Sequence, residues 1–209
     1  MDAWHSYVRR TTSPWNCCRR TGSHYPSRNP GRRCRIPENG RRPRHPGTAV
    51  TPAVIAARQA GVACQVVEYQ HDPGAKSFGL EAAEALGVNP DKVFKTLVAS
   101  LSPGDLAARD LVVAVIPVAA RLDLKALAAA SGAKKAVMAD PKAAERATGY
   151  VIGGISPLGQ RRGLPTVIDE SALTHEQIYV SGGRRGLEIA IGPRDLVTLT
   201  NASVGSIGR

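Results

Sequence analysis

An abrupt change of composition near residue 50 limits what this 209-residue chain can fold into more than any other feature. Residues 1–50 carry 11 arginines, no lysine and only two acidic residues, a net charge of +9. Residues 51–209 carry 17 basic and 15 acidic residues, a net charge of only +2. The basic balance therefore belongs to the first segment, and the remainder has the length and charge of a single globular domain.

The first segment, residues 1–49, is rich in arginine and proline and poor in aliphatic residues. It shows no helical or strand periodicity and offers too little apolar area to offset the entropy of ordering, so we predict that it is disordered. Three interpretations remain open: an organelle transit peptide, an RNA-binding arm, and an extension upstream of a true translation start near Val50. The abrupt change of composition favours the third. Cys17, Cys18 and Cys34 do not make a zinc site, because neither a second cysteine pair nor a His-x-x-x-His motif completes four ligands.

Residues 50–209 show helix and strand signals in a mixed order. We expect helices at 51–61, 77–87, 123–130, from 140 and from 193. We expect strands at 63–69, 93–101, 111–117, 136–138, 166–169, 178–181 and 187–191, with a hairpin or tight connection at 102–105. The last strands have no helices between them, which disfavours a doubly wound parallel sheet. The prediction is one α+β domain, built on a curved, mostly antiparallel or mixed, barrel-like sheet flanked by helices.

Several classes of chemistry have no support in the sequence. There is no phosphate-binding loop, dinucleotide fingerprint, zinc-protease helix or C-x-x-C pair, so we expect neither a metal nor a cofactor. No apolar run approaches the roughly 18–20 residues of a membrane helix, so we expect a soluble chain. Cys64 and His71 are a conceivable nucleophile pair, but strand periodicity places Cys64 and Tyr69 on opposite faces, which favours a structural cysteine.

Lys95 is the most unusual residue of the apolar run 93–98. A charge there is costly unless the ammonium reaches water, an anion or a carbonyl oxygen. The strand alone is equally consistent with an edge-strand lysine that extends to solvent and discourages aggregation.

Two glycine-rich stretches, 153–163 and 181–188, share one plan in which paired glycines come before a pair of arginines. Paired glycines let main-chain N–H groups approach an oxyanion or phosphate closely, and arginine pairs suit an RNA backbone. The alternative is two hairpin turns with solvated arginines. Two loops of the same composition in one domain favour a site, with Arg161, Arg162, Arg184 and Arg185 as RNA contacts.

Taken together, these residues resemble the YbaK family of Cys-tRNA(Pro) deacylases, which belongs to the superfamily of the editing domain of bacterial prolyl-tRNA synthetases. The resemblance covers the chain from about Val50 to near its C-terminus, and residues 1–49 match nothing in the family. It is carried by residues 51–54, 69–73, 78–83, 93–97, 122–125, 138–141, 148–159 and 181–188.

The resemblance implies a YbaK-type editing fold that hydrolyses misacylated tRNA(Pro) without metal or cofactor. It implies a cytoplasmic enzyme that works beside prolyl-tRNA synthetase, with no membrane or DNA partner. By position, Lys95 matches the essential lysine of the family. The other matching pocket positions are Tyr69, Phe78, Gly153, Ser181 and Glu188, and we add Gly154, Ser156, Pro157 and Gly182 from the same two loops.

The expected mechanism uses the substrate's own thiol, which attacks the ester carbonyl and leaves as a cyclic thiolactone. Gly153 and Gly154 would offer N–H groups to the oxyanion, and Lys95 would hold a phosphate or the ester carbonyl. Ser181 and Lys95 as a nucleophile and base form the second mechanism. Two other functions stay open, an Ala-tRNA(Pro) deacylase and a non-catalytic module that binds tRNA or synthetase.

Overall fold

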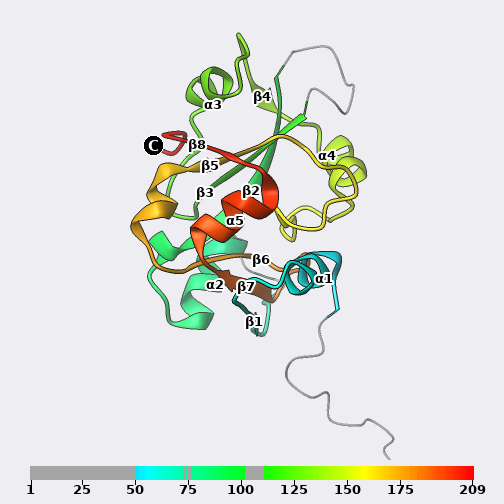
Figure 1. Cartoon of the computed structure of the whole chain (residues 1–209), viewed down its shortest axis with the longest axis vertical. Helices are drawn as coiled ribbons and strands as arrows, with labels where there is room; N and C mark the ends of the chain where they lie inside the picture. Colours follow the sequence, from blue (N-terminus) through cyan, green and yellow to red (C-terminus); the bar gives the residue numbers. More distant parts are fainter. Residues whose placement is uncertain (1–49, 73, 75–76, 102–110) are drawn as a thin grey trace, which may run out of the picture. The chain divides into compact units, whose positions relative to one another are not determined.

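The computed structural model describes residues 50–72, 74, 77–101 and 111–209 (Figure 1). The predicted disordered segment 1–49 and the predicted hairpin or tight connection at 102–105 lie outside the described residues. None of the helices in the described part has the length and apolar content needed to span a bilayer.

The helices begin at the N-capping residues that the sequence suggests. Thr51 Oγ1 accepts a hydrogen bond from Val54 N–H at 3.2 Å, and Asp140 Oδ1 accepts one from Ala143 N–H at 2.9 Å, each followed by proline at the first helical position. The α-helices of the described residues are α1 (Pro52–Gln59), α2 (Phe78–Leu86), α3 (Leu124–Ala130), α4 (Pro141–Thr148) and α5 (Pro193–Thr200).

The described strands form one mixed sheet in the order β1-β7-β6-β2-β3-β5-β8, with β4 paired to β2. Pairs β1–β7, β6–β7, β2–β3 and β2–β4 are antiparallel, and pairs β2–β6, β3–β5 and β5–β8 are parallel. The strands are β1 (Cys64–Glu68), β2 (Val93–Ser100), β3 (Leu111–Pro117), β4 (Val137–Met138), β5 (Thr166–Asp169), β6 (Ile178–Ser181), β7 (Leu187–Ile191) and β8 (Ser203–Gly205). This confirms the predicted α+β class, and β8 is the one of these strands that the sequence did not predict.

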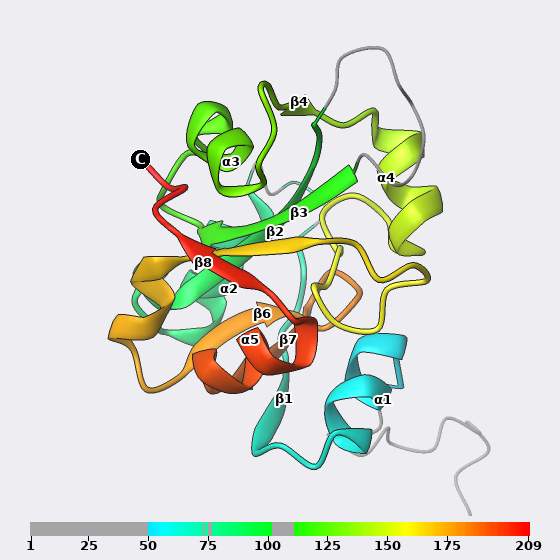
Figure 2. The same cartoon turned by 45° about the horizontal axis from the view of Figure 1, so that its top comes forward.

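Two apolar clusters pack against the two faces of the sheet, and Figure 2 shows α3 and α5 on opposite sides of β2 and β3. Phe94 and Val98 of β2 belong to the larger cluster, together with buried residues of α1, α4 and α5. Ala99 belongs to the second cluster, together with buried residues of α3. Because side chains alternate along a strand, Lys95 and Thr96 project from opposite faces of β2.

In the described part of the chain, the edge of β2 that faces away from β3 is paired with other strands only near its two ends. Its pairing with β6 covers Val93 and Phe94, and its pairing with β4 covers Ala99 and Ser100. Between them, Thr96 has no strand partner on this edge among the described residues. Val98 O accepts a hydrogen bond from Ala139 N–H on this edge. Because every second residue of an antiparallel strand directs its main-chain groups to the same edge, the N–H and C=O of Thr96 also point into the gap.

Candidate active site

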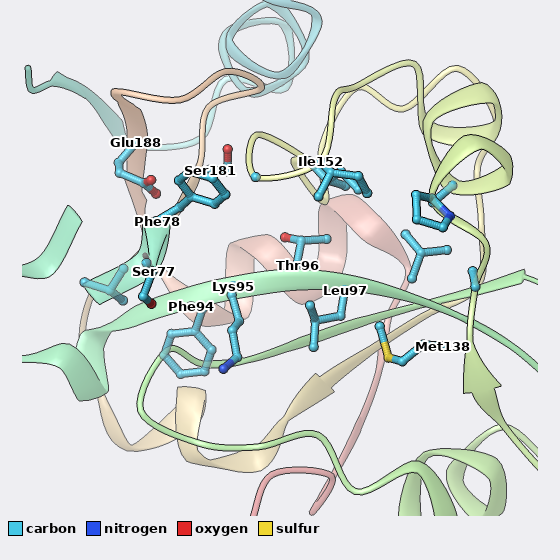
Figure 3. Close-up of a pocket in the computed structure, with 18 of the residues that line it drawn as sticks. Ser77, Phe78, Phe94, Lys95, Thr96, Leu97, Met138, Ile152, Ser181 and Glu188 are labelled. Atoms are coloured by element: carbon cyan, nitrogen blue, oxygen red, sulfur yellow. The ribbon is translucent and has the colours of Figure 1, made fainter. Parts of the chain in front are cut away.

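A cavity of about 490 Å³ lies along this open edge of β2 (Figure 3). Segments far apart in the sequence meet around it, from the end of β1 to β7. The lining residues are Tyr69, Ser77, Phe78, Gly79, Val93, Phe94, Lys95, Thr96, Leu97, Val98, Met138, Ala139, Pro141, Ala144, Ile152, Gly153, Ile155, Ser181 and Glu188.

Six of the residues singled out from the sequence line this one cavity. They come from the end of β1, the start of α2, β2, the 150–163 loop, β6 and β7. The six are Tyr69, Phe78, Lys95, Gly153, Ser181 and Glu188. The remaining candidates are not among the lining residues, namely Gly154, Ser156, Pro157, Gly182, Arg161, Arg162, Arg184 and Arg185.

Two of the candidates outside the lining, Gly154 and Ser156, make contacts within the loop that carries Gly153. Gly154 N–H donates to Val151 O at 2.9 Å, and a Cβ at Gly154 would lie 2.9 Å from Arg184 Cα, so this glycine lets the two glycine loops touch. Ser156 is fully buried, and its Oγ accepts from Leu158 N–H at 3.2 Å. Pro157 borders a second cavity of about 240 Å³.

The Lys95 ammonium is hydrogen-bonded to main-chain oxygens. Its Nζ donates to Ala120 O at 2.7 Å and to Val118 O at 3.1 Å. Burial lowers the pKa of Lys95 below its usual value, and the charge of Arg121 lowers it further. Figure 3 shows the ammonium on the opposite side of β2 from the Ser181 hydroxyl. Two of the three ammonium donors are therefore used, and one is left.

Glu188 and Ser181 are directly opposite each other in the β6–β7 pair. The Glu188 side chain is buried, with 7% of the residue exposed, and burial raises the pKa of its carboxyl to about 8. The Ser181 Oγ accepts from Gly183 N–H at 3.3 Å. Burial also raises the pKa of Tyr69 to about 12, with the Glu188 charge as the next cause. This end of the cavity is thus polar but poorly hydrated.

The Phe78 ring joins the two glycine loops at the cavity. The Arg185 guanidinium carbon lies 4.2 Å from the ring centroid, a cation–π distance, and Arg185 Nη2 donates to Ile152 O at 3.0 Å. Gly153 has a φ of +86°, and a Cβ there would lie 2.7 Å from the Phe78 ring. Only glycine fits this position. Arg184, the other arginine of the pair, lies 3.4 Å from the Glu68 carboxylate.

The conceivable Cys64–His71 pair is not formed. Cys64 is half-buried and packs against the larger core cluster, as expected of a structural cysteine. His71 Nδ1 lies 3.0 Å and 2.9 Å from the two carboxylate oxygens of Glu81. His71 is also 5.7 Å from Phe78 between ring centroids, so it supports the aromatic wall of the cavity.

The structure adds residues that the sequence reasoning missed. Thr96 follows Lys95 directly and lines the cavity from the opposite face of β2. Leu97, Met138 and Ile152 give the cavity an apolar end, and Ser77 precedes α2. Thr96, Leu97, Met138 and Ile152 lie within the stretches that carry the family resemblance, but their meeting at one cavity depends on long-range packing.

Comparison with known proteins agrees with this geometry. The aminoacyl-tRNA editing domain family matches residues 72–199. A curated protein of Enterococcus faecalis, named "Putative Cys-tRNA(Pro)/Cys-tRNA(Cys) deacylase EbsC", is 43% identical over 125 residues, which cover 60% of this chain and 73% of that protein.

Solved structures share the fold. A crystal structure described as "a putative trans-editing enzyme for prolyl tRNA synthetase" is 26% identical with a TM-score of 0.64, covering 77% of this chain and 99% of that one. The crystal structure of the hypothetical protein APE2540 is 25% identical with a TM-score of 0.66, covering 76% of this chain and 100% of that one. This chain therefore belongs to the aminoacyl-tRNA editing domain family and is an aminoacyl-tRNA deacylase, the class that its motifs predicted.

Proposed function

We propose that this enzyme removes misloaded cysteine from tRNA(Pro), acting in trans in the cytoplasm beside prolyl-tRNA synthetase. Its likeness to a relative named as a Cys-tRNA(Pro)/Cys-tRNA(Cys) deacylase supports the choice of substrate. The observation that carries the proposal is the single cavity lined by Lys95, Gly153, Ser181 and Glu188, since these four residues come from distant parts of the sequence.

The cavity offers hydrogen-bond donors but no activated protein nucleophile. Among the described residues no hydrogen bond joins Ser181 to Lys95, and the two side chains lie on opposite sides of β2 (Figure 3). A serine nucleophile needs a base within hydrogen-bond reach. This arrangement disfavours the Ser181–Lys95 pair and supports attack by a group on the substrate.

The cysteinyl thiol is that group. Its sulfur attacks the ester carbonyl carbon, the new C–S bond forms as the C–O bond to the ribose breaks, and the thiol proton passes to the ribose oxygen. The products are the deacylated tRNA and a cyclic thiolactone, which water opens to cysteine. The protein's main task is to hold the thiol over the carbonyl.

Gly153 and Lys95 have separate tasks in this step. The Gly153 N–H has no hydrogen-bond partner within the described part of the chain, whereas the Gly154 N–H is used by Val151 O. We assign the oxyanion to the Gly153 N–H. The remaining Lys95 donor holds the terminal phosphate, and the nearby positive charge of Arg121 adds to the attraction.

This mechanism also supplies selectivity. A pocket wall discriminates by only about 1–3 kcal/mol per methylene, which is too little to separate amino acids of similar size. Alanine and proline have no side-chain nucleophile, so they cannot cyclise. The tRNA itself is selected by the partner synthetase, because the net charge of +2 over residues 51–209 is too small for extensive RNA contact.

The test is deacylation of Cys-tRNA(Pro) and Ala-tRNA(Pro) by the full chain without added synthetase. We expect rapid loss of the cysteinyl ester with a trappable thiolactone, and little loss of the alanyl ester. Equal turnover would instead assign the enzyme to alanine editing. Binding that weakens steeply with salt while both esters stay intact would identify a non-catalytic module.

A further inference from the structure

Two polar atoms of the cavity lack partners. Among the described residues, the buried side-chain atoms without a hydrogen bond are Thr96 Oγ1, Glu188 Oε2 and Ser131 Oγ. The first two belong to residues that line the same cavity, and Figure 3 shows both side chains on the same side of β2. A buried polar group without a partner is costly, so two of them beside one cavity indicate that a ligand supplies the missing contacts.

The cationic side chains of Lys95, Arg184 and Arg185 are engaged elsewhere and do not pair with Glu188. Lys95 donates to Ala120 O and Val118 O. The arginines of the 181–187 loop are also engaged, because Arg184 faces Glu68 and Arg185 stacks on Phe78. No ion pair of Glu188 occurs within the ranges that the structure describes.

An aminoacyl ester of tRNA carries one cationic group close to the reacting carbonyl, its α-ammonium. The phosphates and hydroxyls of the terminal nucleotide carry no positive charge that could neutralise a carboxylate. An α-amino group has a pKa of roughly 7.7–8.0, and burial raises the pKa of the Glu188 carboxyl to about 8. The two groups are therefore matched to share a proton near neutral pH.

We propose that the Glu188 carboxyl, with the Thr96 hydroxyl as an additional acceptor, binds the free α-amino group of the aminoacyl ester. This inference rests on the proposed function and deepens it by naming a substrate requirement. An ester whose α-amino group is formylated, acetylated or joined to a peptide has no ammonium to offer. The cavity thus accepts aminoacyl-tRNA and rejects N-blocked aminoacyl-tRNA and peptidyl-tRNA.

The experiment compares Cys-tRNA(Pro) with N-acetyl-Cys-tRNA(Pro), which keeps the thiol and the ester but loses the ammonium. With the full-length wild-type chain we expect kcat/KM to fall by about tenfold or more on acetylation. In Glu188→Gln, turnover of the free-amino ester falls and that of the acetylated ester does not, so the ratio approaches one. Glu84→Gln, which changes an exposed carboxylate of α2, is the matched control and keeps the wild-type ratio.

The other possible outcomes of this experiment distinguish failure of this inference from failure of the proposed function. Equal turnover of both esters by the wild type would overturn the assignment of the amino group and leave the proposed function intact. A ratio that stays high in Glu188→Gln would trace the rejection to the bulk of the acetyl group and would also overturn it. Loss of neither ester would overturn the proposed function and this inference together. A non-hydrolysable 3′-cysteinylamido-adenosine, with and without the N-acetyl group, gives the same comparison by calorimetric affinity.

Discussion

Lys95 donates to two main-chain oxygens, and this has separate consequences for activity and for stability. Lys95→Ala removes the donor proposed for the terminal phosphate, and an ester held out of position should react about 100-fold more slowly. It also leaves the Val118 and Ala120 carbonyls unpaired, a loss of about 1–3 kcal/mol of stability. Deacylation kinetics together with thermal unfolding separate the two effects.

Ser181→Ala is the partner of that experiment. Because the Ser181 hydroxyl makes no hydrogen bond to a basic group in the described residues, this variant should retain substantial deacylation. Lys92→Ala, an exposed lysine just before β2, should behave as the wild type. Complete inactivity of Ser181→Ala with normal folding would instead support a serine nucleophile.

Glu188 makes the stability of the fold depend on pH. Its carboxyl titrates near 4.5 when exposed and near 8 in the native protein, because burial disfavours the charge. Between these values the native state holds a proton that the unfolded chain has released, so stability falls as pH rises through this window. The Tm of the wild type should therefore drop between about pH 5 and about pH 9, and Glu188→Gln should remove that part of the drop. Parallel melting curves for the two proteins would contradict this expectation.

Individual site residues could be predicted where the signal lies within a short stretch of sequence. Lys95 stands out because a charge interrupts an apolar run, and the glycine pairs stand out by composition. The partners of Lys95 could not be predicted, since Val118 and Ala120 reach it only through the pairing of β2 with β3. The same holds for Arg185, whose stacking on Phe78 joins a loop to the distant start of α2.

At the scale of elements, the 150–163 loop depends on one glycine conformation. In Gly153→Ala the new Cβ would meet the Phe78 ring at 2.7 Å, and the residue would keep a φ of +86°. We expect a stability loss of about 1–3 kcal/mol and a severe loss of deacylation. Gly163→Ala in the same loop is the control, because a Cβ there meets nothing within 4 Å. A comparable loss of stability and deacylation in both variants would contradict this specific role of Gly153.

Helices and paired strands were largely predictable because their signals lie within a few residues. Thr51-Pro52 and Asp140-Pro141 mark the starts of α1 and α4, and Gly87 and Gly149 end α2 and α4 in the left-handed conformation. β8 has three residues and no alternating pattern, so only its parallel partner β5 defines it. The interruption in the edge of β2 likewise follows from pairing between distant strands.

At the scale of the whole molecule, charge is separated along the chain, with +9 in residues 1–50 and +2 in the remainder. If residues 1–49 contact RNA, the KM of the full chain for charged tRNA should rise more steeply with salt than that of a chain starting at Val50. Each phosphate contact adds about 0.7–0.9 to the logarithmic slope, so several contacts are measurable. Identical slopes would exclude an RNA-binding arm and favour the upstream-extension interpretation.

The unpartnered stretch of β2 also matters for inhibition. β3 pairs with the other edge of β2 along seven residue pairs, so β2 itself is held in place beside the gap between β6 and β4. A compound with a single amide can hydrogen-bond to the main-chain N–H and C=O of Thr96, in the way that a neighbouring strand would. A resistance mutation that changes a side chain would not remove these hydrogen bonds, because the protein contributes only main-chain groups to them.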